Sequence, residues 1–345
     1  MAEPASAQTV PSPWPVVVRA VVLLTVIVGV LLTAFAWPAV RSSVHDVPIA
    51  VAGPAAATDQ VVAALDQRMP GAFDITRVAT AAEAEKLILD REIDGAIDLS
   101  TGKPQILTAS AASASIAQTL QGVGTALSQA QATGAAPAVA VRDVVTLPAD
   151  DPRGTGLAAA ALPLVMGGMF AAILLTNLVK GRVRRIAGAF AFSITGGLLM
   201  TAILQLWLGS LDGDFFANTG AIALTMAATS LTILGLESLL GVAGFGIGAA
   251  TMMLIGNPLS GNTSSPEMLP GWTGTLGQLM PPGAGGQLLR STAFFDGHGI
   301  THSVIVLIAW LALGAALSLL GHHRSRRAAA PAQGATAEPA TLATA

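Results

Sequence analysis

Six long runs of apolar residues alternate with more polar segments along the chain and predict membrane-spanning helices. The first runs from Val16 to Val40 and is interrupted only by Arg19, near one end. After Arg19 about 20 residues are apolar, enough for a helix to cross a hydrocarbon core of roughly 30 Å. A cleaved signal peptide ending near Ala36 is the alternative, but its apolar region would normally hold only about 7–15 residues.

Five further spans are expected at 157–179, 186–208, 217–236, 239–256 and 303–320. The third and fourth are divided by a tight hairpin near 235–238, because Glu237 is the only charge between Phe215 and Ile255. Between the first two spans, residues 41–156 change in character and carry short, alternating apolar patterns. They predict an inserted α/β domain, and the fold class is therefore an α-helical polytopic membrane protein with one such domain.

The pattern within 41–156 predicts the element order β-α-β-α-β-β-α-β on a mixed sheet. Strands are expected at 48–52, 73–78, 95–99, 105–108 and 139–147, and helices at 58–69 and 80–92. Thr58 and Thr80 are the expected N-caps, and Glu83 completes a capping box with Thr80. The spacing of Ile116, Leu120, Val123 and Leu127 predicts a narrow apolar seam on a third helix.

Composition agrees with a bilayer environment. Of the 345 residues, 52% are hydrophobic and 11% are charged, against about 25% charged residues in a soluble domain. The mean hydropathy is +0.66. A net charge of −3 gives no basic footprint for nucleic acid, and the absence of cysteine excludes disulfides and thiolate chemistry.

Basic residues orient the spans, because they gather on the cytoplasmic side of membrane proteins. The loop between the second and third spans contains Lys180, Arg182, Arg184 and Arg185. The last span is followed by Arg324, Arg326 and Arg327, and the first has Arg19 near its start. With six spans all three groups fall on one side. We therefore expect a multi-pass protein of the cell membrane with both termini cytoplasmic and the domain 41–156 extracytoplasmic.

Motifs for catalysis are absent from the sequence. It contains no P-loop, no HExxH and no GxSxG pattern. His298 and His302 are four residues apart, but two histidines alone make a poor metal site, so we assign no catalytic, cofactor or metal residues and expect no enzyme. Glu237 either contacts a neighbouring group near the cytoplasmic turn or takes part in proton or substrate transfer, a role that a buried charge in a membrane often has.

Small residues and the last long loop complete the candidate residues. Gly241, Gly244 and Gly248 predict close helix packing, within one chain or between two. The loop 257–302 is expected to form two amphipathic pieces, about 266–280 and 284–295, divided by Pro281-Pro282-Gly283. With Trp272, these three residues form a candidate outer gate, and Trp272, Phe294 and Phe295 are expected at the outer membrane interface.

Several segments resemble the membrane subunits of type-2 ABC exporters, in particular the branch related to phage infection protein. They are PIAVAGP, REIDGAIDL, ILTASAASASIAQ, DDPRGTGLAAAALPLVMGG and the loop NPLSG…PEMLPGW…LMPPGAGGQLLRSTAFFDG, within a six-span pattern over most of residues 15–322. The resemblance implies a homodimeric or heterodimeric pore that exports a hydrophobic or amphipathic compound. It also implies that ATP is bound by a separate ATPase subunit and not by this chain. The amphipathic coupling helix usual before the first span is not evident.

These patterns divide the chain into a disordered N-terminus (1–13), a first span (14–40), the outer domain (41–156), a five-helix region (157–322) and a disordered cytoplasmic tail (323–345). Lys180, Arg182, Arg184, Arg185 and Glu237 are candidate contacts for the ATPase. The expected function is that of an exporter permease. The alternative is a non-transporting membrane protein whose outer domain binds a ligand, an envelope component or a partner protein.

Overall fold

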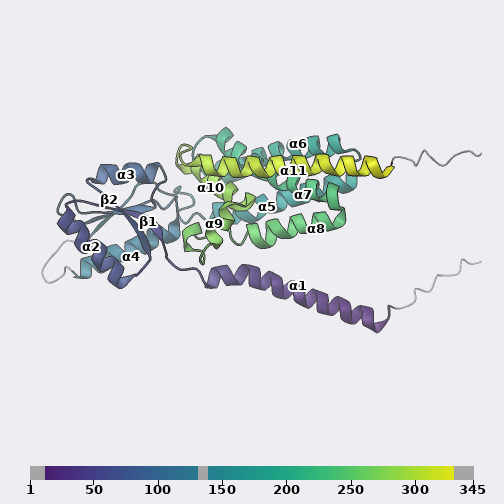
Figure 1. The fold of residues 1–345 in the computed structure, drawn as a ribbon. Coiled ribbons are helices and arrows are strands. Elements are labelled where there is room, and N and C mark those ends of the chain that lie inside the picture. The colour runs from purple at the N-terminus through teal and green to yellow at the C-terminus, as the bar shows by residue number, and fades with distance from the viewer. Residues whose placement is uncertain (1–11, 131–138, 330–345) are drawn as a thin grey trace, which may run out of the picture.

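The computed structural model describes residues 12–130 and 139–329, and it is built from a small α/β unit and a helical bundle (Figure 1). The segments 1–13 and 323–345 are expected to be disordered, and most of each, residues 1–11 and 330–345, lies outside the described residues. Residues 323–329, expected in the tail, are helical. The elements are α1 (Trp14–Val40), β1 (Val47–Ala52), α2 (Ala55–Arg68), β2 (Phe73–Val78), α3 (Ala81–Leu89), β3 (Gly95–Asp98), β4 (Gln105–Thr108), α4 (Ala114–Ala130), β5 (Ala140–Asp143), α5 (Thr155–Leu178), α6 (Arg182–Thr201), α7 (Phe215–Leu240), α8 (Val242–Ala250), α9 (Thr273–Gln278), α10 (Pro281–Phe294) and α11 (Ile300–Ala329).

The five strands form one mixed sheet in the order β2-β1-β3-β4-β5. Helices α2 and α3 connect strands that run parallel, so β1 pairs in parallel with both β2 and β3. The short turn at Gly102 reverses the chain, and β4 pairs antiparallel with β3 before α4 returns it to a parallel β5. The expected element order and mixed sheet are confirmed.

Helices cover both faces of this sheet. Ala84 and Ile88 of α3 pack on one face, while the expected seam of α4 packs with Leu65 of α2 on the other. The capping box is present in a shifted form, since the Glu83 amide donates to the Thr80 hydroxyl and the Glu83 carboxylate accepts from the Ala79 amide, one residue before the cap. Thr58 is not a cap. Helix α2 already begins at Ala55, and the buried Thr58 hydroxyl donates back to the Ala55 carbonyl.

Helix α7 lies at the centre of the bundle and contacts α5, α6, α8, α10 and α11. Among the described residues, five helices are long and apolar enough to cross a membrane: α1, α5, α6 with the π-helical turn Ala202–Trp207, α7 and α11. The sixth expected span is shorter, because α8 and its π-helical turn together cover only Val242–Gly256. The hairpin turn is at Gly241, where φ is +65°, and not at 235–238.

The loop 257–302 differs from its expected form. Two helical pieces are present, since α9 lies within the first expected range and α10 covers nearly all of the second, but Pro281 and Pro282 do not lie between them. They are the first residues of α10, where a missing amide costs nothing. Most of α10 is buried against α5, α7 and α11. Phe295 is not at a membrane interface either, since it is 3% exposed and belongs to the core of the α/β unit.

Helix α1 lies apart from the bundle over most of its length (Figure 1), its end contacts the turn Thr251–Gly256, and Pro38 is its one buried residue. Its beginning and the end of α11 lie at the end of the bundle farther from the sheet. An isolated apolar helix of 27 residues needs lipid or another protein surface around it. The α/β unit and the bundle meet at the opposite end, where α9 and α10 lie.

Candidate functional site

Arg91 joins the α/β unit to the bundle from an unusual backbone position. It follows the end of α3 with a φ of +62°, in the left-handed region that glycine usually occupies at helix ends. The chain reverses there, and the Glu92 amide donates to the Leu87 carbonyl over 2.9 Å. This conformation costs an L-residue about 1–2 kcal/mol. The contacts of its side chain can offset this cost.

The guanidinium group of Arg91 binds one face of α10. It donates to the Gln287 carbonyl oxygen at 3.1 Å, to the Gln287 side-chain oxygen at 2.6 Å and to the Ser291 hydroxyl at 2.5 Å. Its carbon Cζ also lies 4.9 Å from the centre of the Phe295 ring. Nearby, His298 lies 3.8 Å from Asp90, the residue before Arg91. These contacts fix the end of α3 to the end of α10.

A second set of contacts fixes the loop 257–272 to the α/β unit. The Ser113 hydroxyl donates to the Ser264 carbonyl at 3.1 Å, and the Ser43 amide donates to the Met268 carbonyl at 2.9 Å. Met268 packs on the core that α2 and α4 cover. On its other side the segment before α10 is tied to α11, because the Trp310 indole donates to the Leu279 carbonyl at 2.7 Å.

Two acidic and two basic side chains gather at this junction. Asp94 precedes β3, Glu267 lies in the short 3₁₀ turn Pro266–Met268, and Arg290 lies in α10, so that with Arg91 the four come from separate parts of the chain. Arg91, Asp94 and Glu267 line a cavity of about 90 Å³ beside Phe295. Burial and the Glu267 carboxylate raise the pKa of Asp94 to about 7, against the opposing effect of the two arginines.

The start of α5 is fixed by a buried carboxylate next to this junction. Asp151 is 6% exposed, and its oxygens accept from the Thr155 amide at 2.8 Å and the Gly156 amide at 2.7 Å. Burial opposes the charge, but these bonds and one from Ser210 hold the pKa of Asp151 below its usual value. The carboxylate thereby caps the positive end of the α5 dipole.

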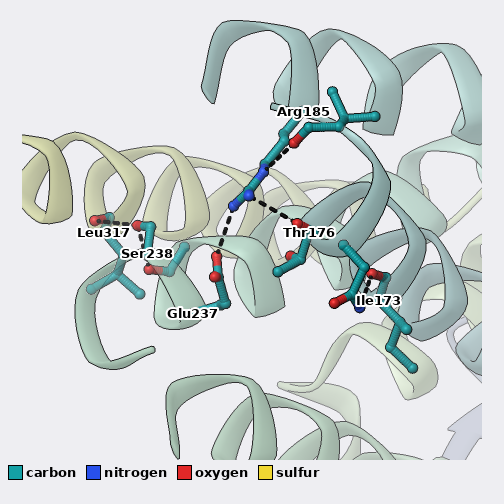
Figure 2. A network of polar contacts seen from close by, with 9 residues as sticks. Ile173, Thr176, Arg185, Glu237, Ser238 and Leu317 are labelled. Atoms are coloured by element: carbon teal, nitrogen blue, oxygen red, sulfur yellow. Dashed lines mark hydrogen bonds and ion pairs between the residues drawn. The ribbon is translucent and has the colours of Figure 1, made fainter. Parts of the chain in front are cut away.

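At the other end of the bundle, the candidate coupling residues separate into two groups. Figure 2 shows Arg185 between Glu237 of α7 and the end of α5. Its guanidinium lies 3.4 Å from the Glu237 carboxylate, and it donates to the Thr176 and Val179 carbonyl oxygens at 2.8 Å each. Glu237 is therefore in the last turn of α7 and paired within the chain, rather than at the hairpin turn.

The other basic residues of this loop are not paired in this way. Lys180 and Arg184 are exposed. Arg182 is half-buried at the start of α6, and its Nε and Nη2 atoms have no hydrogen-bond partner among the described residues. The structure therefore brings together Arg185 and Glu237, and leaves Lys180 and Arg184 on the surface.

The candidate packing glycines also differ from one another. A Cβ atom on Gly244 would lie 2.0 Å from the Leu236 carbonyl oxygen, and one on Gly248 would lie 3.2 Å from Ile233. Both positions let α8 approach α7 closely. Gly241 has open space around it and forms the turn instead.

The candidate gate residues do not form one group. Trp272 is 71% exposed, whereas Pro281, Pro282 and Gly283 are buried at the start of α10. A Cβ on Gly283 would lie 2.2 Å from the Gly277 carbonyl oxygen, so the start of α10 packs tightly on α9. These three residues are part of a packed helix start.

The sequence reasoning missed Arg91, Asp94, Glu267 and Arg290. One signal was present, since Glu267 and Arg290 are the only charged residues from 257 to 295. Opposite charges isolated in a long uncharged loop indicate a common partner. No protein-family model, curated protein or solved structure matches this chain. The function of the junction is therefore inferred from its own geometry.

Proposed function

We propose that this chain is the membrane subunit of an exporter that moves a hydrophobic or amphipathic compound outward and is driven by a separate ATPase. In this proposal α1, α5, α6, α7 and α11 cross the cell membrane, α8 enters it, both termini are cytoplasmic and the α/β unit is outside. The five apolar helices support the membrane location. The basic loop 180–185 at the end farther from the sheet supports the orientation.

The observation that carries the proposal is that α7 connects two polar contacts at opposite ends of the bundle. At the inner end Glu237 of α7 pairs with Arg185, beside the exposed Lys180 and Arg184. At the outer end α7 packs on α10, to which Arg91 ties the α/β unit. An ATPase that binds the exposed basic residues would displace this loop, and a rigid helix would carry the displacement outward.

Helix α1 supports an assembly of two membrane subunits. Its exposed apolar surface extends over nearly its whole length. A second copy, or a related chain, would cover this helix in a homodimer or heterodimer, and lipid would cover the rest. No nucleic acid is expected as a partner.

The test combines topology, partner and transport. The chain lacks cysteine, so single cysteines at Lys180 and Lys103 can be labelled with a membrane-impermeant maleimide in intact cells. We expect labelling at 103 and none at 180. Purification from native membranes should yield an ATPase, and cells that lack the gene should retain a lipophilic dye longer. Unchanged efflux together with no co-purified ATPase would refute the transport proposal.

A second candidate is a non-transporting protein whose outer unit binds a ligand. It is favoured by an apolar groove of about 360 Å³ between α2 and α4, lined by Val61, Leu65, Met69, Val123 and Leu127 among others. The substitution Ala64→Trp would fill this groove. If the groove is the functional site, the variant should lose binding of an apolar fluorescent probe. Efflux should then be the same in cells with the variant and in cells with wild type, whether or not efflux is detected at all.

A further inference from the structure

A small polar cavity lies where α4, α5 and α10 meet. Its volume is about 60 Å³, and its lining includes Arg153, Arg290, Ser110, Ser115 and Ser264. A single water molecule needs only about 10–15 Å³ of volume measured in this way, so the cavity holds several. No acidic residue lines it. The cavity therefore has room for a carboxylate or phosphate group, and a positive lining around it.

Arg290 is buried at this cavity without adequate partners. Its side chain is 7% exposed, its Nε atom has no hydrogen-bond partner, and its Nη2 lies 3.5 Å from the Asn262 carbonyl oxygen, the long limit of a hydrogen bond. Asp94 and Glu267 act on its charge from a distance, but neither pairs with it among the described residues. An unpaired buried cation is costly, and such groups normally have a partner.

The beginning of α4 adds donors on the same side. Ser113 caps this helix, with its hydroxyl accepting from the Ile116 amide at 3.3 Å. The amides of Ala114 and Ser115, the first two residues of α4, have no acceptor among the described residues, and both residues line the cavity. The positive end of a 17-residue helix therefore faces the same space as Arg290.

A larger, mostly apolar cavity adjoins the polar one. It measures about 500 Å³ between the end of α1, the start of α5 and the loop 257–264. The two cavities share Ala158, Asn262, Thr263 and Ser264 in their linings. Beyond these residues, Phe35, Pro38 and Leu162 supply apolar surface. Because α1 is otherwise exposed, this space lies beside the surface that lipid would occupy in the proposed membrane orientation.

We propose that the two cavities form one binding site for a single-headed anionic amphiphile, with its carboxylate or phosphate between Arg153 and Arg290 and its hydrocarbon tail between α1 and α5. The inference rests on the proposed membrane function and narrows its substrate class. Arg290 and the α4 amides bind the head, and Arg153, which is exposed, closes the polar cavity from outside. A fatty acid or an alkyl phosphate has the single anionic head and the hydrocarbon tail that this arrangement would bind.

The test is equilibrium binding of radiolabelled dodecyl phosphate to the purified full chain in phosphatidylcholine nanodiscs, with empty nanodiscs subtracted. We expect Arg153→Gln and Arg290→Gln each to raise the Kd at least about tenfold, because each variant removes hydrogen bonds from a charged donor to the anionic head. Leu162→Trp should weaken binding by filling the tail cavity. The matched control is Arg77→Gln, an exposed arginine of β2 that lies outside both cavities.

Arg153→Gln keeps the test decisive if Arg290→Gln fails to fold. Inorganic phosphate that binds as tightly as dodecyl phosphate would assign the site to a free anion and overturn the lipid source. Equal affinity of wild type and both arginine variants would overturn the site altogether. Binding needs no ATPase, so normal binding without efflux refutes only the transport function. Efflux that persists while wild type binds no dodecyl phosphate refutes only the site.

Discussion

Replacing Arg91 should release the α/β unit from the bundle by an amount that the structure allows us to estimate. The side chain makes three hydrogen bonds to α10 and stacks on Phe295. At about 1 kcal/mol for each hydrogen bond and about 0.5–1 kcal/mol for the stacking, the contacts contribute about 3–4 kcal/mol. Glycine in place of Arg91 also removes about 1 kcal/mol of backbone strain at φ +62°.

The docked state should therefore lose about 3 kcal/mol in Arg91→Ala and about 2 kcal/mol in Arg91→Gly. The ratio of undocked to docked molecules then rises roughly 150-fold for alanine and roughly 30-fold for glycine. The assay is a distance distribution between two spin labels, one at Lys103 of the α/β unit and one at Val183 at the far end of the bundle. Both sites are exposed. Cysteine is absent from the natural chain, so no other site is labelled.

The order of the variants is the decisive result. Arg91→Lys keeps a charge but cannot make the forked contacts to Gln287 and Ser291, so it should fall between wild type and glycine. Identical distributions for Arg91→Ala and Arg91→Gly would show that the left-handed backbone is not strained. Distributions of Arg91→Ala that match wild type would show that docking depends on the loop 257–272 and not on this side chain.

Three further predictions concern the junction and the bundle. Arg185→Gln should destabilise the purified protein more than Glu237→Gln does, because only Arg185 also binds the end of α5. A double-mutant cycle followed by thermal unfolding should give a coupling energy of about 1 kcal/mol between the two residues, and zero coupling would refute the pairing. Gly244→Leu should reduce the yield of folded protein while Gly246→Leu, with open space around it, should not, and equal yields would contradict the close contact. The pKa of Asp94 is raised to about 7, above its usual value of about 4, so its contribution to stability is present below pH 4 and is lost as pH rises through 7. Asp94→Asn should therefore be more stable than wild type at pH 8 and equally stable at pH 4. Parallel stability curves of the two proteins against pH would rule out a raised pKa.

The elements that the sequence predicts well depend on local patterns. The seam of α4 and the Thr80–Glu83 capping box are set by residues within one or two helical turns, and the long apolar runs need no tertiary information. The errors are also local in origin. Thr58 has a good N-cap side chain, but Pro54 and the alanines after it start the helix one turn earlier. Pro281 and Pro282 end a helix or begin one, and only their packing decides.

The candidate site could not be predicted because its members are distant in sequence. Asp94 and Arg290 act on each other's charge only when the α/β unit packs on α10, and no periodicity in either segment encodes that proximity. The left-handed backbone of Arg91 is likewise invisible, because the side chain that stabilises it binds almost 200 residues away. The sequence predicts the hairpin near Glu237 because it is the one charge in a long apolar stretch, whereas in the structure Arg185 pairs with it inside the last turn of α7.

Arg290 offers the clearest separation between a structural and a functional role for a buried charge. Replacing buried charged groups by hydrophobic residues such as methionine is often neutral or stabilising, because the cost of burying the charge disappears. At pH 6 Asp94 is largely protonated, so of the two acidic groups that act on Arg290 the substitution leaves mainly Glu267 behind. We expect Arg290→Met to keep or raise the midpoint of thermal unfolding while dodecyl phosphate binding falls at least about tenfold. If stability and binding both fall, the guanidinium serves the fold; if binding is unchanged, the cavity takes no anion, and the charge is retained for a reason other than a ligand.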